Sequence, residues 1–405
     1  MTRTHSQAEI ASQEVDREPF RRDPATVLSY LALICFAFWN YGYGPALALL
    51  RVELHFSYAM LGVYTAAWSG GSVLTGFTFP VVARRLSRST LLWGSAVLAS
   101  AGAALFGLGT GIAPTLAGAA ILGLGGTMLL VVLQAMLSDR HGEWRDRALT
   151  EANIGAAACA VLAPLALGAL TLSALGWRAG FALPFLGLVA LYLRYRRQAL
   201  PTPSTPDTVP TSRRPLPLAC WLFAGLAAAS MGVEFCLVYF GAEQLQSSGL
   251  STTAAVTAMS VHYLGLLLGR VLGAIATRRP KRTVPLLCVS LLVTAGGFLL
   301  FWLTTTPYLA VLGLLLAGLG IANLYPLSVA LSLAAAPHRE DQANSRSQLL
   351  GGGLVIVAPY LLGHLADRHG LTNAFAVEPV LIGLCLLLLL GGLRARATAG
   401  PDRPA

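Results

Sequence analysis

Twelve long apolar runs alternate with short polar segments along this chain of 405 residues. Each run has about 20 residues, which is enough for an α-helix to cross a bilayer core of roughly 30 Å. Six runs precede a long polar segment and six follow it. The runs cover residues 27–49, 59–81, 90–110, 114–138, 150–174, 179–197, 216–240, 252–275, 283–304, 308–333, 346–366 and 373–394. The pattern predicts an all-α polytopic membrane protein built from two six-helix bundles.

The polar segments give the expected domain boundaries. We expect a disordered tail at residues 1–26, an N-terminal six-helix bundle at 27–197, a linker at 198–215, a C-terminal six-helix bundle at 216–394 and a second tail at 395–405. The linker, QALPTPSTPDTVPTSRRP, is rich in Pro, Thr and Ser, a composition typical of unstructured connections. Each bundle is thus expected to form from one continuous half of the chain.

The positions of the basic residues predict the orientation of the chain. The net charge is +10, although only 11% of the residues are charged and the mean hydropathy is +0.66. All but four of the 28 Lys and Arg residues lie in the tails, the linker and alternate loops, on one predicted side of the membrane. The positive-inside rule puts that side, and hence both termini, in the cytoplasm. We therefore expect a multi-pass protein of the cell inner (cytoplasmic) membrane with no nucleic-acid partner.

The sequence contains no motif for enzymatic or metal chemistry. The six cysteines lie inside apolar runs and form no C-x-x-C pair, so they predict neither a disulfide framework nor a zinc site. There is no phosphate loop and no nucleophile elbow, which argues against ATP-driven transport and against catalysis. We expect a protein that is not an enzyme and that holds no cofactor and no metal.

The two halves of the chain resemble each other. LTGFTFPVVARRLSRST (74–90) aligns with LLGRVLGAIATRRPKRT (267–283), and a second alignment matches Pro164 with Pro359. Membrane proteins built from such repeats form their substrate sites at the repeat interface near the midplane of the bilayer. Because alternating access uses this symmetry, the repeat favours a transporter.

The chain also resembles the major facilitator superfamily over all twelve runs. The loops PVVARRLSRS and GAIATRRPKR resemble the family's cytoplasmic signature G-x-L-A-D-R-x-G-R-[RK], although Arg84 and Thr277 replace its aspartate. The resemblance implies two six-helix bundles related by a pseudo-twofold axis, a working monomer, and a central cavity lined by the first, fourth, seventh and tenth helices. In the fifth run, GAAACAVLAPLALG partly matches the glycine-rich segment that is typical of antiporters in this family.

The string GHLADRHG (363–370) is the best match to that signature, but it lies at the opposite end of the eleventh run. Three of its side chains could also ligate a metal, although no further ligand is near in the sequence. We expect Gly363 and Gly370 to serve helix packing and capping, and Asp367 and Arg368 to form an external turn. This expectation follows from the position of the segment at the outer end of the eleventh run and not from its match to the signature.

Pairs of glycines inside the runs predict close helix packing. Gly70 and Gly71 lie in the second run, and Gly125 and Gly126 lie in the fourth. Small residues allow the backbones of two membrane helices to approach each other. We expect these glycines to pack helices rather than to bind a ligand.

Polar and aromatic side chains on the cavity-lining helices are candidate substrate contacts. They are Trp39, Asn40, Tyr41 and Tyr43 in the first run, Gln134 in the fourth, and Asn323 and Tyr325 in the tenth. Rings combined with amides suit a moderately polar, partly flat organic compound. Packing inside a bundle is the alternative role for the rings, whereas an amide that faced lipid would be costly.

Two ionisable residues inside the runs are candidates for proton coupling. A charge at the centre of the bilayer costs at least ~2.5–3.5 kcal/mol, which makes Glu234 in the seventh run a functional candidate. A position near the outer end of its helix, facing water, is the alternative. His262 in the eighth run has a side chain that titrates near neutral pH in water. Neutral packing is the alternative for His262.

Charged residues near the cytoplasmic ends of the runs are candidates for a gate. They are Arg85, Arg88, Glu151, Arg270, Arg278, Lys281 and Arg346. We expect Glu151 to pair with Arg270 or Arg278 when the cytoplasmic side is closed.

These observations together predict a secondary active transporter that works by alternating access. We expect it to move a small organic compound across the cytoplasmic membrane in exchange for protons, which is proton-coupled efflux. The alternatives are a proton-coupled uptake symporter for a sugar or an organic acid, and a membrane sensor without transport. The expected partners are the lipid bilayer, a small-molecule substrate and protons.

Overall fold

The computed structural model describes residues 20–198, 200, 215–277, 283–337 and 339–398, and every regular element in them is helical. Most of the expected tails and linker lie outside these residues. The helices are α2 (Pro24–Leu54), α3 (Tyr58–Ala83), α4 (Arg88–Leu108), α5 (Ile112–His141), η1 (Gly142–Trp144), α6 (Arg145–Thr171), η2 (Trp177–Phe181), α7 (Ala182–Tyr195), α8 (Leu218–Ser247), α9 (Thr252–Ala276), α10 (Thr283–Leu303), α11 (Pro307–Ile321), α12 (Leu324–Ala334), α13 (Glu340–His369), α14 (Leu371–Ala374) and α15 (Val377–Thr398).

These elements match the twelve spans that the apolar runs predict. Within the described residues, ten helical segments are long and apolar enough to cross a membrane. Two of these segments are interrupted, because α11 and α12 share one span and α14 and α15 share another. The other two spans are α3, and α7 with the short helix η2 before it.

Local chemistry fixes where the helices begin and end. The Asp23 side chain accepts a hydrogen bond from Thr26 N and caps α2, and the hydroxyl of Ser57 caps α3 in the same way. Gly370, with a φ of 82°, ends α13 in the left-handed region. The expected external turn at Asp367 is wrong, because α13 continues through His369 and places Asp367 in its last turn.

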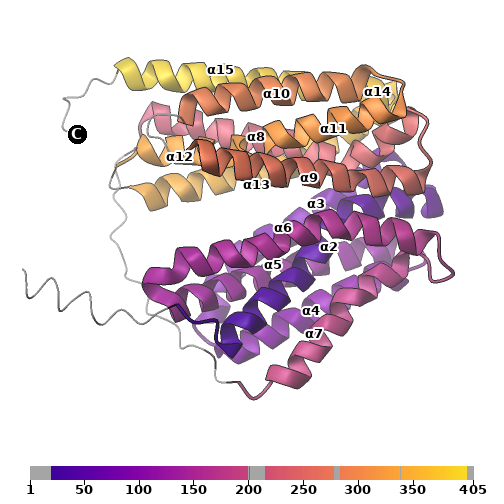
Figure 1. Ribbon diagram of the computed structural model, residues 1–405, viewed down its shortest axis with the longest axis vertical. Coiled ribbons are helices and arrows are strands. Elements are labelled where there is room, and N and C mark those ends of the chain that lie inside the picture. The colour runs from indigo at the N-terminus through magenta and orange to yellow at the C-terminus, as the bar shows by residue number, and fades with distance from the viewer. Residues whose placement is uncertain (1–19, 199, 201–214, 278–282, 338, 399–405) are drawn as a thin grey trace, which may run out of the picture.

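Two bundles make up the molecule, with α2 to α7 in one and α8 to α15 in the other (Figure 1). The start of α2 and the end of α15 lie at the same end of the molecule (Figure 1), which we name the terminal end. We name the opposite end, where α3 begins and α13 ends, the distal end. The two bundles lie closer together at the distal end than at the terminal end (Figure 1).

Glycines bring the two bundles into backbone contact in the distal half. A Cβ atom on Gly44 of α2 would lie 2.5 Å from the carbonyl oxygen of Val238 in α8. A Cβ atom on Gly62 of α3 would lie 2.8 Å from the Cα atom of Tyr360 in α13. These approaches leave no room for a side chain, so the bundles are tightly joined at this end.

Glycines also set the spacing of helices inside the N-terminal bundle. A Cβ atom on Gly71 or Gly125 would fall within 2.5 Å of the backbone of a neighbouring helix, and one on Gly126 would press on the ring of Phe36. The expected packing role is confirmed for these three glycines. It is wrong for Gly70, where a Cβ atom would meet nothing within 4 Å.

We expect Gly123→Ala to lower the thermal unfolding midpoint of the detergent-solubilised protein by several degrees. The added Cβ atom would lie 2.1 Å from the carbonyl oxygen of Trp68, and overpacking of this kind costs about 1–3 kcal/mol. Gly94→Ala is the matched control, because its Cβ atom would meet nothing within 4 Å and alanine favours helix. Equal midpoints for the two variants would contradict this account of the packing.

Candidate functional site

A cavity of about 970 Å³ lies between the two bundles. Its walls come from α2, α3, α5 and α6 on one side and from α8 and α13 on the other. Most of the wall is apolar or aromatic. The polar members are Asn40, Tyr41, Ser69, Ser72, Thr75, Thr127, Gln134, Asn153, Tyr239, Ser345 and Gln348. The residues that line this cavity include no acidic residue, no basic residue and no histidine.

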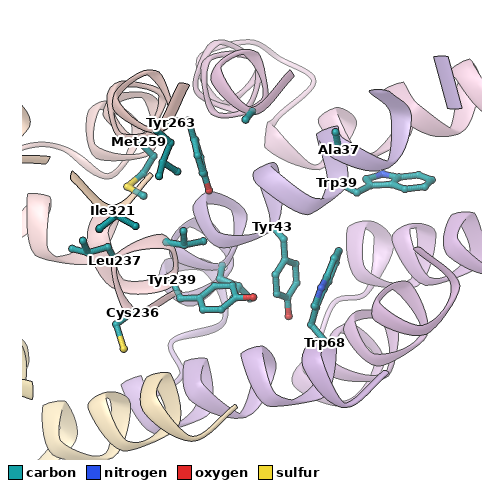
Figure 2. Packing of buried hydrophobic residues seen from close by; sticks show 14 of the residues in the cluster. Ala37, Trp39, Tyr43, Trp68, Cys236, Leu237, Tyr239, Met259, Tyr263 and Ile321 are labelled. Carbon is teal, nitrogen blue, oxygen red and sulfur yellow. The ribbon is translucent and has the colours of Figure 1, made fainter. Parts of the chain in front are cut away.

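Three aromatic rings close the cavity toward the distal end. Figure 2 shows Tyr43 between Trp68 and Tyr239, which both line the cavity. The ring centroid of Tyr43 lies 4.4 Å from that of Trp68 and 6.2 Å from that of Tyr239. The Tyr43 hydroxyl donates to the carbonyl oxygen of Tyr64 at 2.9 Å, which fixes the ring in place. We name these three rings the floor of the cavity; helices of both bundles contribute to it.

The seven candidate substrate contacts have four different locations. Asn40, Tyr41 and Gln134 line the cavity. Tyr43 is buried in the floor. The indole of Trp39 does not line the cavity: it is fully buried, points away from Tyr43 and Tyr239 (Figure 2), and donates to the carbonyl oxygen of Phe181 at 3.0 Å inside its own bundle.

Asn323 and Tyr325, the other two candidates, line a second pocket of about 410 Å³ inside the C-terminal bundle. Asn323 lies at the break between α11 and α12, and its Nδ2 donates to the carbonyl oxygen of Gly269 at 2.9 Å. Gly273 permits this approach, because a Cβ atom there would lie 1.9 Å from the Asn323 side chain. The amide thus holds the broken helix against α9.

Glu234 and Arg270 also line the second pocket. The two charges interact, and Arg270 interacts further with the hydroxyl of Tyr41. Arg270 and Tyr41 share a small gap beside α6, while Tyr41 also lines the large cavity. One residue each from α2, α8 and α9 therefore connects the charged pocket to the uncharged cavity.

His262 lies away from both pockets. Its ring is fully buried in the C-terminal bundle, where Gly318 of α11 packs against it. The backbone of Leu314 is its polar neighbour, but neither ring nitrogen makes a hydrogen bond of regular geometry within the described residues. Its position is that of a packed side chain.

Glu151 has partners in its own bundle at the terminal end. It accepts two hydrogen bonds from Arg22, at 2.8 and 2.9 Å, one from Arg147 at 3.3 Å and one from Tyr30 at 3.2 Å. The bundles are apart at this end, so the expected pairing of Glu151 with Arg270 or Arg278 in the closed state stays a prediction.

The remaining gate candidates are dispersed at the terminal end. Arg88 forms an ion pair with Asp139, which joins α4 to α5. Arg85 and Arg346 are exposed. Arg278 and Lys281 lie outside the described residues.

Asp23 anchors the start of α2 at the same end. It accepts hydrogen bonds from Thr26 and from Arg140 of α5. Partial burial alone would raise the pKa of Asp23, but these hydrogen bonds outweigh it, so its pKa lies below the ordinary value. The carboxylate therefore stays charged at neutral pH and keeps the cap in place.

An ion pair at the distal end was not expected from the sequence. Arg51 of α2 donates to Glu243 of α8 at 3.1 Å, and Glu243 is only 4% exposed. The expected seventh run ended at residue 240, whereas α8 extends to Ser247 and includes Glu243. The signal was the position of Arg51, one of the few basic residues on the distal side.

A second missed carboxyl group is Glu378, at the start of α15. It is fully buried, with the thiol of Cys236 as its polar neighbour, and neither oxygen makes a regular hydrogen bond within the described residues. It stood inside the twelfth apolar run as the only acidic residue there. That isolation was the signal that could have identified it.

A helical fold with two bundles around a central cavity defines a multi-pass membrane transporter. The chain belongs to the Major Facilitator Superfamily, whose family model matches residues 29–345. This family consists of transporters rather than enzymes, in agreement with the sequence. No curated protein matches the chain.

Solved structures of other transporters share the fold. A bacterial homologue of the human lysosomal transporter Spinster, in an inward-facing and unoccupied conformation, matches with a TM-score of 0.73 and 16% identity, over 94% of this chain and 98% of that one. A peptide transporter mutant matches with a TM-score of 0.75 and 17% identity, over 94% and 96%. A nucleoside transporter mutant matches with a TM-score of 0.71 and 15% identity, over 92% and 100%. At these identities the matches show the fold alone.

Proposed function

We propose that the protein exports a small, uncharged organic compound that carries aromatic or apolar groups, in exchange for protons. The observation that carries this proposal is the cavity of about 970 Å³ between the bundles, which has aromatic walls, neutral polar groups and no charged lining residue. Its volume is at the upper end of the range for small-molecule sites, about 300–1,000 Å³.

The orientation of the chain supports access to the cavity from the cytoplasm, the side on which an exporter loads its substrate. Basic residues gather at the terminal end, and the positive-inside rule assigns such an end to the cytoplasm. The cavity is closed by Tyr43 toward the distal end, and Ser345 and Gln348, close to the start of α13 at the terminal end, belong to its wall. A compound would therefore reach the cavity from the cytoplasm in this conformation.

The lining of the cavity supports the choice of an uncharged substrate. A charged compound would lose its hydration shell without gaining an ion pair in the cavity, which is unfavourable. The rings of Phe36, Trp68 and Phe235 offer apolar contacts, while Gln134 and Gln348 offer hydrogen bonds. Uptake of an organic acid, the main alternative, has less support because no lining residue carries a positive charge.

Glu234 is our proposed carrier of the coupling proton. Glu234 is linked to the cavity through Arg270, which interacts with it, and through Tyr41, which interacts with Arg270 and lines the cavity. Protonation would remove the charge that Arg270 faces, and Tyr41 would transmit the change in Arg270 to the cavity wall. The partial antiporter motif in the fifth run supports exchange, and Gly168 in that motif packs against Thr257 of the other bundle. His262 has less support, because it is packed away from this path.

Proteoliposomes with an imposed pH gradient test the proposal. We expect uncharged aromatic compounds to drive proton movement in the direction opposite to their own, as measured with a pH-sensitive dye and a labelled compound. We expect Glu234→Gln to abolish proton movement, while Glu53→Gln, an acidic residue paired with Arg178 at the distal end, retains it. Movement of compound and protons in the same direction would instead establish symport, and no flux for any compound would favour a sensor.

We further propose that Glu151 exchanges partners during transport, leaving Arg22 for Arg270 when the terminal end closes. We expect the double variant Glu151→Cys/Arg270→Cys to form a reductant-sensitive disulfide under oxidising conditions, detected by mass spectrometry of the protein in proteoliposomes. Arg88→Cys/Arg270→Cys is the control, because Arg88 is held inside its own bundle by Asp139. A disulfide yield no higher than that of the control would contradict this partner exchange.

A further inference from the structure

The carboxylate of Asp367 joins the two bundles at the distal end. Its Oδ1 accepts a hydrogen bond from the backbone N–H of Tyr58, and its Oδ2 accepts one from the N–H of Ala59, both at 2.8 Å. Asp367 belongs to the last turn of α13 in the C-terminal bundle, whereas Tyr58 and Ala59 begin α3 in the N-terminal bundle. The two hydrogen bonds therefore exist only while the bundles are together at this end.

These two amides belong to the N-terminal turn of a helix and have no partner within it. The first four N–H groups of an α-helix cannot bond inside the helix, and the positive end of its dipole favours a negative charge. The hydroxyl of Ser57, the N-cap residue of α3, accepts a hydrogen bond only from the N–H of Met60, at 3.2 Å. Asp367 thus completes the cap of a helix in the opposite bundle.

Close packing holds the carboxylate at this position. Gly363 lies one turn before Asp367, and a Cβ atom there would lie 2.3 Å from the carbonyl oxygen of Tyr58. The guanidinium of Arg51 lies over the ring of Tyr58, 3.8 Å from the ring centroid. Arg51 also donates a hydrogen bond to Glu243. The contact from α13 through α3 and α2 to α8 is therefore continuous.

We propose that Asp367 holds the distal end closed during the transport cycle. It must release the first turn of α3 before the cavity can open on that side. The inference rests on the proposed alternating access. The partners of Asp367 are backbone N–H groups, so Asp367 is the only side chain on which these hydrogen bonds depend. The ion pair between Arg51 and Glu243 joins α2 to α8, so it can break independently of the hydrogen bonds of Asp367.

Hydrogen–deuterium exchange of the full-length protein in nanodiscs tests this role. In Asp367→Asn, we expect peptides spanning 57–62 and 363–369 to exchange about tenfold faster than in the wild type. We also expect peptides spanning 76–84 and 345–352, at the terminal end, to exchange more slowly because that end closes. A purely local structural role would change the distal peptides alone, and that result, like no change at all, would overturn the proposal.

Two further variants make the result specific. Asp367→Glu retains a carboxylate and should restore part of the wild-type exchange pattern, even if Asp367→Asn loses stability. Asp146→Asn removes a highly exposed carboxylate at the terminal end and should leave both sets of peptides unchanged. Because the measurement needs neither substrate nor protons, it can succeed where the flux assay fails, and the two proposals are thereby tested independently.

Discussion

Backbone contact between the bundles in the distal half is the constraint on which the rest of the structure depends. Gly44, Gly62, Gly168 and Gly363 all lie where a Cβ atom would come within 2.8 Å of the opposite bundle. Such contact extends over only a limited length of three pairs of helices, α2 with α8, α3 with α13 and α6 with α9, and the bundles separate toward the terminal end. The cavity and its aromatic floor at Tyr43 follow from this one-sided closure.

Each bundle is held together by its own contacts, which is what allows it to move as a unit. Gly71 and Gly125 bring helices together inside the N-terminal bundle, and Asn323 fastens the broken span to α9 inside the C-terminal bundle. By contrast, polar contacts across the interface are few among the described residues: Arg51 with Glu243, Asp367 with the start of α3, Tyr263 with the carbonyl oxygen of Tyr41, and Arg270 with the Tyr41 hydroxyl. A small number of polar contacts can be exchanged during a transport cycle without unfolding either half.

The twelve spans could be predicted from the sequence because the need for about 20 apolar residues per span is visible in one dimension. Asn40 and Gln134 could be chosen as cavity residues because an amide in a membrane helix must face protein or water. The rotation of each helix about its own axis could not be predicted, so Trp39 was placed with Asn40 although it faces its own bundle. Glu243 was missed because it lies just beyond an apolar run. The role of Asp367 depends on a contact more than 300 residues away in the chain, between side chain and backbone, which no local pattern encodes.

The central claim of the proposed function is that the cavity between the bundles opens to the cytoplasm while the distal end is closed. The most direct measurement is labelling of a single cysteine at Gln348, in a background without the six native cysteines, by a membrane-impermeant maleimide applied to oriented vesicles. The account predicts rapid labelling in inside-out vesicles, where the cytoplasmic face is exposed, and slow labelling in right-side-out vesicles. Rapid labelling only from the outer face would contradict it.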